Sequence, residues 1–306
     1  MPNLSKKIKN EIKSATGGVI INDKIFKNFY LPLIQYYIND KKNKHIKTYI
    51  IGVQGGQGTG KTVLAALIKT CLKSKRYSTE AFSIDDFYKS NIEQKKFFKL
   101  QQKNPFYKTR GLPGTHKFNK LYGVLQAAKN GHRFIIPHFD KSLYGGAGDI
   151  SKQTTIINNR LDFIIIEGWC VNMPFVDPKK FPLILSENKY ANKFFKELDP
   201  KKKYYKTVLN YIKKYQKIWK LLDNKTIISG ENIKWIEGWR VEQEKKMVAL
   251  KKEGMAIDKI KIFIKPYIPF TYLLYNRNIK NKKNINCLLT IKKNHLPKKL
   301  NFYNIN

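Results

Sequence analysis

Short hydrophobic runs separated by amphipathic stretches occur along most of the 306-residue chain. The runs at residues 48–53 and 163–166 are almost wholly apolar and rich in β-branched residues. Such runs are typical of strands that are buried on both faces of a parallel sheet. Weaker runs of the same kind predict further strands at residues 81–84, 134–136, 226–228 and 234–236.

Apolar residues recur at helical spacing between these runs. In residues 62–72, three leucines and one isoleucine fall on one face, which predicts an amphipathic helix. We also predict helices at residues 121–129, 241–252 and 258–264, and largely helical structure in residues 1–45 and 188–222. Strands that alternate with helices predict a three-layer α/β fold around a mostly parallel sheet.

The most informative motif lies between the first predicted strand and the helix that follows it. Residues 55–62 fit the phosphate-binding loop pattern G-x-x-x-x-G-K-[ST] in the strand–helix context that the pattern requires. In this pattern backbone N–H groups surround the phosphates, the lysine reaches the β- and γ-phosphates, and the final hydroxyl binds Mg²⁺. The predicted ATP-binding residues are Gly55, Gly56, Gln57, Gly58, Thr59, Gly60, Lys61 and Thr62.

Acidic residues follow two other predicted strands. Asp85 and Asp86 come directly after residues 81–84, and Glu167 ends the run at residues 163–166. The carboxyl ends of parallel strands face the ligand crevice. Either aspartate is therefore placed to accept the proton of an attacking hydroxyl, and Glu167 is placed to hold Mg²⁺ or its waters.

Two loops punctuated by glycine carry further polar residues. Residues 110–116 read Arg-Gly-Leu-Pro-Gly-Thr-His, and Arg110 could bind a carboxylate there through two parallel hydrogen bonds. Asp140 and Lys141 precede the glycines of residues 145–148, a pattern typical of segments that order over a substrate. His116 and His138 are too isolated to indicate a metal site.

Charge and cysteine content narrow the class of protein. Lysine and arginine number 60 against 22 acidic residues, a net charge of +38. The excess is nearly all lysine and is scattered, so it indicates compositional bias rather than a specific nucleic-acid partner. Three unpaired cysteines, no apolar run of the ~18–20 residues that span a bilayer, and no signal-peptide core predict a cytoplasmic protein without a membrane partner. The sequence leaves the oligomeric state open.

Six elements in a fixed order resemble a known family. They are G-V-Q-G-G-Q-G-T-G-K-T, S-I-D-D-F-Y, R-G-L-P-G-T-H, P-H-F-D-K-S, I-I-I-E-G-W and W-R-V-E-Q-E. In this order they resemble the D-glycerate 3-kinases of plants and cyanobacteria and their fungal ATP-binding relatives. These kinases belong to the branch of P-loop kinases that includes uridine kinase, phosphoribulokinase and bacterial pantothenate kinase.

The resemblance implies one P-loop kinase domain with a parallel five-stranded core and helical lids. We expect a helical segment in residues 1–45 and a kinase core in residues 46–276. Lid or substrate insertions are expected near residues 88–120 and 186–225, followed by a basic extension in residues 277–306.

The resemblance also implies roles for single residues. Asp85 corresponds to the catalytic base, acting with Lys61, and Glu167 and Thr62 correspond to the residues at the metal. Arg240 either contacts the ATP phosphates or anchors its own helix. Lys117 replaces an acid that is usual in the family and that we expect to cap the next helix. The remaining candidates bind the substrate: Asp86, Tyr88, Arg110, His116, Asp140 and Lys141.

These features predict a kinase that uses ATP and Mg²⁺ to phosphorylate a small molecule. D-glycerate, giving 3-phosphoglycerate, is the first expectation for the acceptor. A kinase of the same fold for a nucleoside, pantothenate or a sugar phosphate is the alternative. An ATP-dependent nucleic-acid-binding protein is a third reading that only the net charge supports.

Overall fold

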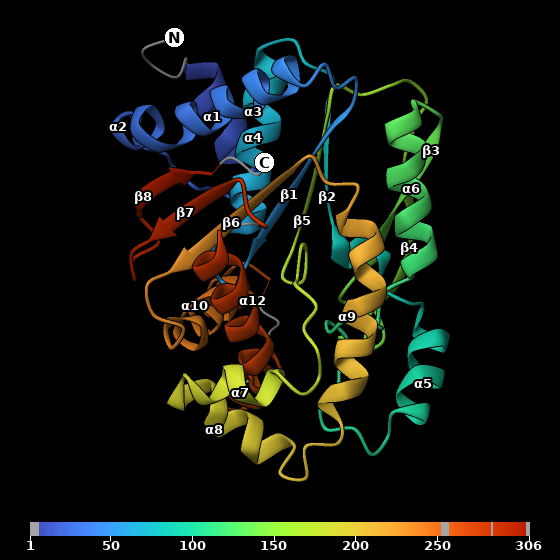
Figure 1. Ribbon diagram of the computed structural model, residues 1–306. Coiled ribbons are helices and arrows are strands. Elements are labelled where there is room, and N and C mark those ends of the chain that lie inside the picture. Colours follow the sequence, from blue (N-terminus) through green and yellow to red (C-terminus); the bar gives the residue numbers. More distant parts are fainter. Residues whose placement is uncertain (1–5, 252–256, 283, 304–306) are drawn as a thin grey trace.

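The computed structural model describes residues 6–251, 257–282 and 284–303, and a six-stranded sheet forms its centre (Figure 1). The strand order is β2-β5-β1-β6-β7-β8, with β8 antiparallel to β7 and all other neighbours parallel. The strands are β1 (Tyr49–Gly55), β2 (Thr79–Ser83), β5 (Phe163–Gly168), β6 (Asn224–Gly230), β7 (Cys287–Ile291) and β8 (Pro297–Phe302). Every residue of β1 and β5 is buried, as their apolar sequences predict.

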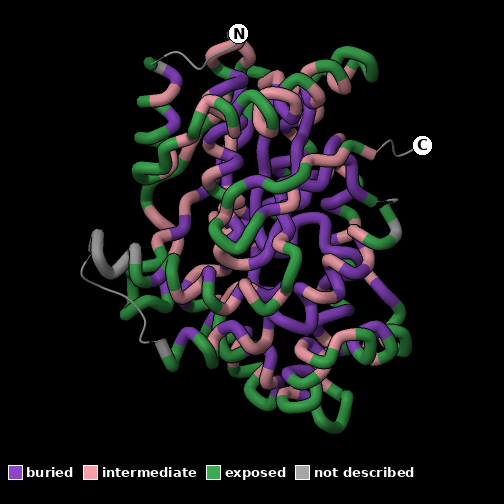
Figure 2. Tube along the Cα trace, turned by 90° about the vertical axis from the view of Figure 1, so that its left-hand side faces the viewer, coloured by how far each residue is buried: buried purple, intermediate pink, exposed green. Residues whose placement is uncertain are grey.

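Helices cover both faces of the sheet and gather beyond the carboxyl ends of its strands (Figure 1). The buried residues form a continuous core through the middle of the molecule (Figure 2). This arrangement confirms the three-layer α/β fold with helical lids. The helices are α1 (Lys6–Ala15), α2 (Asp23–Ile25), α3 (Leu31–Asn43), α4 (Lys61–Ser74), α5 (Asn91–Leu100), α6 (Phe118–Asn130), α7 (Phe181–Ser186), α8 (Lys189–Leu198), α9 (Tyr205–Trp219), α10 (Trp235–Lys251), α11 (Ile257–Ile264) and α12 (Ile268–Asn281), with short π or 3-10 turns at Phe26–Tyr30, Ile84–Phe87 and Lys265–Tyr267.

Two of the predicted strands are placed differently in the structure. The run at residues 134–136 lies in β3 (Phe134–Asp140), which pairs antiparallel with β4 (Asp149–Ile157) in a separate two-stranded sheet. The fifth parallel strand is instead β7, which lies within residues 277–306, where we expected a basic extension. The strand predicted at residues 234–236 is wrong because Lys234 lies in a turn and the next two residues begin α10, where Ile236 and Trp239 are buried at helical spacing.

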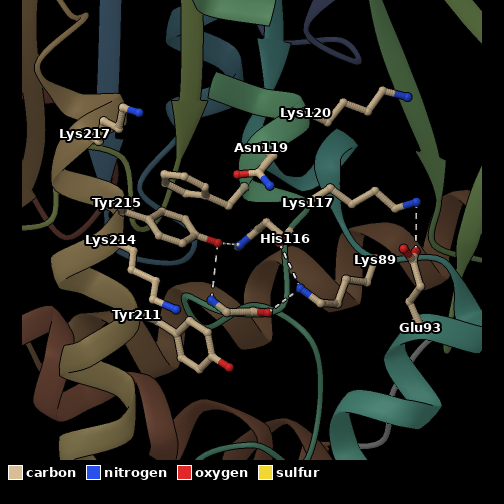
Figure 3. A pocket seen from close by; sticks show the side chains of 12 residues that line it. Lys89, Glu93, His116, Lys117, Asn119, Lys120, Tyr211, Lys214, Tyr215 and Lys217 are labelled. Atoms are coloured by element: carbon tan, nitrogen blue, oxygen red, sulfur yellow. Dashed lines mark hydrogen bonds and ion pairs between the residues drawn. The ribbon is translucent and has the colours of Figure 1, made fainter. Parts of the chain in front are cut away.

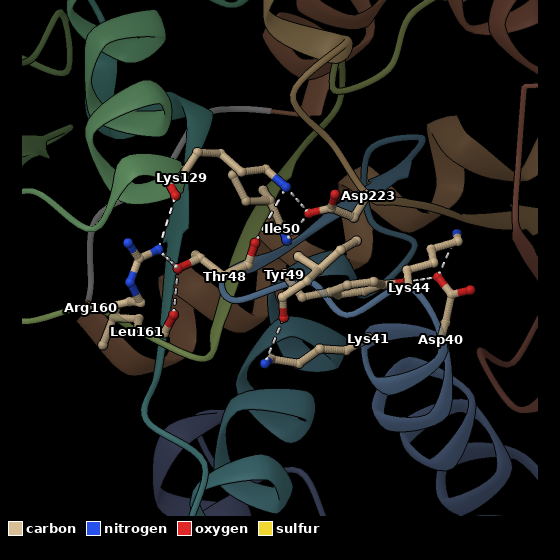
Figure 4. A network of polar contacts seen from close by, with 11 residues as sticks. Asp40, Lys41, Lys44, Thr48, Tyr49, Ile50, Lys129, Arg160, Leu161 and Asp223 are labelled. Carbon is tan, nitrogen blue, oxygen red and sulfur yellow. Dashed lines mark hydrogen bonds and ion pairs between the residues drawn. The ribbon is translucent and has the colours of Figure 1, made fainter.

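A polar network closes the amino ends of the central strands (Figure 4). Lys129, at the end of α6, forms an ion pair with Asp223, and the same carboxylate accepts a hydrogen bond from the Ile50 backbone N–H at 2.7 Å. The Tyr49 hydroxyl donates to Asp40 at the end of α3. These contacts join two helices to the amino ends of β1 and β6.

Two further features are the state of the cysteines and the apolar character of the helices. Cys71, Cys170 and Cys287 are buried and form no disulfide. Within the described part of the chain, no helix has both the length and the apolar character that a membrane crossing requires.

Candidate active site

The phosphate-binding loop, residues 55–62, connects the end of β1 to the start of α4. Gly58 and Gly60 have φ angles of +75° and +88°, in the left-handed region that favours glycine. A Cβ atom at Gly55 would lie 2.7 Å from the Ile228 carbonyl oxygen, and one at Gly58 would lie 2.8 Å from the Trp239 carbonyl carbon. Close packing against β6 and α10 therefore requires glycine and fixes the shape of the loop.

Lys61 and Thr62 begin α4 and point back toward the sheet. The Lys61 ammonium donates to the Gly56 carbonyl at 2.8 Å, and the Thr62 hydroxyl donates to Glu167 Oε1 at 2.9 Å. The first N–H groups of this 14-residue helix have no partners within the helix and attract anions. Loop amides, a helix start and an ammonium group are the groups that surround phosphates in the P-loop pattern.

Glu167 lies at the carboxyl end of β5, directly opposite Thr62. Burial raises the pKa of its carboxyl group, and the nearby Lys61 opposes that rise. A hydroxyl and a carboxylate are oxygen ligands of the kind that Mg²⁺ prefers. The described residues contain no group of three or more His, Cys, Asp and Glu side chains that could hold a metal. The pair of Thr62 and Glu167 suits Mg²⁺, which usually keeps waters and substrate phosphates as its other ligands.

Asp85 lies in the 3-10 turn that follows β2, on the same edge of the sheet. Its Oδ2 atom is 2.6 Å from the Lys141 ammonium. Burial by itself would raise the pKa of Asp85, but the ion pair with Lys141 outweighs burial and lowers it to about 2. Asp85 also interacts electrostatically with Lys61 and Glu167, so the structure brings these four charged groups together.

Asp86 makes different contacts from its neighbour. Its Oδ2 atom accepts a hydrogen bond from the Ser83 N–H at 3.0 Å, while the Ser83 hydroxyl accepts one from the Asp85 N–H at 3.2 Å. This reciprocal capping box holds the turn. The other carboxylate oxygen of Asp86 lies 3.8 Å from His138 Nδ1. The geometry therefore favours Asp85 over Asp86 as the residue that meets an attacking hydroxyl.

Arg110 is held in place by the glycine-rich turn that follows Lys141. Its Nη1 atom donates to the carbonyls of Gly146 and Ala147 at 2.7 and 2.6 Å. The guanidinium lies over the rings of Tyr88 and Phe139, 5.8 and 5.3 Å from their centres. Its Nη2 and Nε atoms make no hydrogen bond with any described residue, so they are available to an anionic ligand.

His116 ends the 110–116 loop and is buried against Tyr88. The two rings stack with centres 4.6 Å apart, and His116 Nδ1 is 3.0 Å from the Tyr215 hydroxyl. The second ring nitrogen, Nε2, is buried and has no partner in the described part of the chain. Burial lowers the pKa of His116 to about 4, despite the opposing charge of Asp85, so the imidazole is neutral near pH 7.

Two candidate residues make local contacts instead. Asp140 accepts hydrogen bonds from the Ser142 N–H and hydroxyl at 2.8 and 2.6 Å, which shapes the turn that carries Lys141. Arg240 forms an ion pair with Glu244 one turn along α10 and lies 5.8 Å from the centre of the Phe263 ring of α11. These contacts suit an anchor between two helices, and contact with ATP phosphates stays a prediction.

Sequence patterns missed two aromatic residues that support the phosphate-binding loop. The Tyr275 hydroxyl accepts a hydrogen bond from the Gly56 N–H at 2.7 Å and lies 3.2 Å from the Ile228 carbonyl. Trp239 packs against Gly58, and its indole N–H donates to the Lys293 carbonyl at 2.7 Å. W-R-V-E-Q-E contains Trp239, but no motif marks Tyr275, which is 219 residues away from Gly56.

In a mostly parallel sheet, strand β1 leads into a phosphate-binding loop, and Glu167 and Asp85 lie beside that loop. The chain is an ATP-dependent P-loop kinase for a small molecule. No protein-family model matches the chain. It is 29% identical to the uncharacterized kinase mug58 of Schizosaccharomyces pombe, over 91% of this chain and 97% of the yeast protein. It is 24% identical to the chloroplastic D-glycerate 3-kinase of Arabidopsis thaliana, over 79% of this chain but only 53% of the plant protein.

A solved structure of D-glycerate 3-kinase from Cryptococcus neoformans shares the fold, with a TM-score of 0.79 and 21% identity. The match covers 89% of this chain and 98% of the other. The protein is thus a P-loop kinase related to the D-glycerate 3-kinases and to the fungal kinases of this type.

Proposed function

We propose that the protein transfers the γ-phosphoryl group of ATP to the 3-hydroxyl of D-glycerate. The observation that carries this proposal is the group of Asp85, Lys141 and Arg110 beside the phosphate-binding loop. A small hydroxy acid offers its hydroxyl to Asp85 and its carboxylate to the free Nη2 and Nε atoms of Arg110. Similarity to two proteins that are named D-glycerate 3-kinase supports the same acceptor.

The proposed reaction is a direct transfer in which Asp85 acts mainly by orienting the acceptor. The 3-hydroxyl oxygen forms a bond to the γ-phosphorus while the bond from that phosphorus to the bridging oxygen breaks, which releases ADP. The hydroxyl proton passes to Asp85. Because the pKa of Asp85 is about 2, its carboxylate is a weak base that accepts this proton only late, as the new bond forms. A loose transition state for phosphoryl transfer requires little more than this.

The remaining groups bind the phosphates, the metal ion and the acceptor. Lys61 and the loop amides surround the β- and γ-phosphates, where charge develops during transfer. Thr62 and Glu167 would hold Mg²⁺, which neutralises phosphate charge when it is bound. His116, neutral and with Nε2 unpartnered, is suited to a hydrogen bond with a polar group of the acceptor. The buried, unpaired cysteines fit a reducing compartment, and we place the protein in the cytoplasm.

A panel of acceptors tests this proposal. The purified protein, with ATP and Mg²⁺, is offered D-glycerate, uridine, pantothenate or ribulose 5-phosphate in separate reactions, and ADP release is measured. We expect the highest kcat/KM with D-glycerate, because uridine lacks a carboxylate for Arg110. Turnover of another acceptor with none of D-glycerate would keep the kinase and reject this substrate.

A further inference from the structure

A basic cavity with a volume of about 760 Å³ opens beside the 110–116 loop (Figure 3). Residues near the starts of α5 and α6, the end of the 110–116 loop and one side of α9 line it. The lining includes His116 of the candidate active site but not Lys61, Asp85 or Glu167, so the cavity adjoins that site without including its phosphate-binding residues. Its volume is in the range of pockets that hold small organic ligands.

Five lysines and one glutamate line this cavity: Lys89, Lys117, Lys120, Lys214, Lys217 and Glu93. Two of the lysines have partners. Lys117 forms an ion pair with Glu93 at 2.8 Å, and Lys89 donates to the carbonyls of Gly114 and His116 at 2.7 and 3.1 Å.

The other three lysines, Lys120, Lys214 and Lys217, have no hydrogen bond or ion pair with any residue that the structure describes. Ammonium groups of like charge around one cavity repel each other, and a multivalent anion relieves that repulsion. The Lys217 ammonium also lies 4.3 Å from the centre of the Tyr122 ring. The cavity therefore has an excess of positive charge that this chain does not neutralise.

Lys117 lies where this cavity meets the start of α6. Lys117 occupies the N-cap position of α6 without a capping hydrogen bond from its side chain. Lys117 pairs with Glu93, the single acidic residue of the lining, whose carboxylate also accepts hydrogen bonds from the Ser90 N–H and hydroxyl.

The cavity is connected to the 110–116 loop by two of its lining residues. The Tyr215 hydroxyl accepts a hydrogen bond from the Gly114 N–H at 3.3 Å and contacts His116 Nδ1 at 3.0 Å (Figure 3). Lys89 holds the carbonyls of the same two residues. A ligand that attracts Lys89 or shifts Tyr215 therefore acts on His116, whose ring stacks on Tyr88 in the candidate active site.

We infer that the basic cavity binds a small phosphorylated metabolite with at least two negative charges, and that this ligand adjusts acceptor binding through His116. Phosphate groups suit the three unpaired ammonium groups. Phe118, Tyr211 and Tyr215 offer apolar surface to the organic part of the ligand. A single cavity of this volume has room for a small molecule, whereas a nucleic-acid strand tracks along an extended groove. The binding site does not rest on the identity of the acceptor.

Calorimetric titration of the full-length protein tests the site. Mg²⁺ and β,γ-imido ATP are kept saturating so that the phosphate-binding loop is occupied. The probes are pyrophosphate, fructose 1,6-bisphosphate, citrate and hexauridylate. Lys214→Ala/Lys217→Ala removes two lining charges, and Lys206→Ala/Lys213→Ala is the matched control, because both control residues are exposed on α9 and do not line the cavity.

We expect one phosphorylated probe to bind with a stoichiometry of one. Its affinity should fall by about tenfold or more in Lys214→Ala/Lys217→Ala, since two charge contacts are lost. The control variant and Arg110→Ala should keep wild-type affinity, which separates this cavity from the acceptor site. The bound probe should also change the KM for D-glycerate in the wild type but not in Lys214→Ala/Lys217→Ala.

Several results would overturn the inference. Absence of binding by both phosphorylated probes, or equal loss in the two double variants, would remove the site. Equal binding of citrate would reject the phosphate assignment. Tighter binding of hexauridylate would show that the cavity prefers a nucleic-acid strand to a small metabolite. If the protein proves inactive on D-glycerate, the titrations with the variants still decide whether the site exists.

Discussion

The two edges of the central sheet differ in how completely their buried polar groups are paired. At the amino edge, the Asp223 carboxylate has both the Lys129 ammonium and a backbone N–H as partners (Figure 4). At the carboxyl edge, His116 Nε2 and Gln57 Oε1 are buried with no partner in the described part of the chain. Among the described residues, the Lys61 ammonium has only the Gly56 carbonyl of its own loop and no ion pair, although a carboxylate lies nearby.

This difference separates polar groups that stabilise the fold from polar groups that are open to a ligand. A buried polar atom without a partner destabilises a protein by about 1–3 kcal/mol, so such atoms are uncommon where a fold can avoid them. The amino edge satisfies its buried groups with residues of the chain itself. The carboxyl edge leaves donors and acceptors open, as a site for a phosphorylated substrate and its acceptor requires.

Removing one lysine at each edge of the sheet should give the largest and most different effects. Lys61→Ala should reduce kcat by ~10²–10³-fold or more, because a preorganised charge on the β- and γ-phosphates is lost. Its stability should change little. Lys129→Ala should leave kcat unchanged and lower the free energy of unfolding by about 1–3 kcal/mol, since Asp223 loses its cation. Steady-state kinetics and urea unfolding of both variants provide the measurements, and a Lys61→Ala variant with normal turnover would refute the phosphate site.

The two adjacent aspartates should differ in effect although they lie in the same turn. Asp85→Asn keeps the size of the side chain but cannot accept a proton, so kcat should fall by ~10²–10⁴-fold with little change in ATP affinity. Asp86→Asn should mainly weaken the capping box and lower stability by about 0.5–2 kcal/mol. If Asp86→Asn causes the large loss of kcat instead, the two roles must be exchanged.

Arg110 separates recognition of the acceptor from recognition of ATP. Arg110→Ala should raise the KM for D-glycerate by ~10–100-fold, because a charge-assisted contact with the carboxylate is lost. Arg110→Lys should restore only part of it, since one ammonium cannot make two parallel hydrogen bonds. The KM for ATP should stay within about twofold of the wild-type value. A parallel rise in both KM values would show that Arg110 supports the whole site rather than the acceptor.

The pH dependence should show the smallest effect between pH 6 and 8. Because the pKa of His116 is lowered to about 4, this side chain stays neutral throughout that interval. Its protonation begins to reduce kcat/KM for the acceptor only as the pH falls toward 4. In the unfolded chain His116 takes up its proton near pH 6.5, so its contribution to stability declines as the pH falls from 6.5 toward 4. A clear acid limb near pH 6.5 that disappears in His116→Gln would contradict the neutral imidazole.

Local patterns predicted the parts of the fold and site that depend on neighbouring residues. The strand, glycine loop and helix at residues 49–74 form one continuous motif, and both buried strands β1 and β5 are apolar at nearly every position. The polar strand β4 and the placement of β3 outside the main sheet depend on pairing partners that no local pattern encodes.

The contacts between distant residues were the part that sequence patterns could not supply. Lys141 and Asp85 are 56 residues apart, and only the folded chain shows their ion pair. The capping role of Asp86 depends on the conformation of one turn, and the basic cavity is assembled from α9 and a loop about 100 residues earlier. Motifs therefore indicated which residue types are present, whereas packing decided which of them meet.

Phosphorus NMR of the wild-type reaction tests directly whether the phosphoryl group goes to the 3-hydroxyl of D-glycerate. The protein is incubated with ATP, Mg²⁺ and D-glycerate, and the position of the new phosphate ester is read from its resonance and coupling to the adjacent protons. We expect 3-phosphoglycerate as the sole phosphorylated organic acid, with an equal amount of ADP. Formation of 2-phosphoglycerate, or ADP release without any phosphorylated acid, would contradict it.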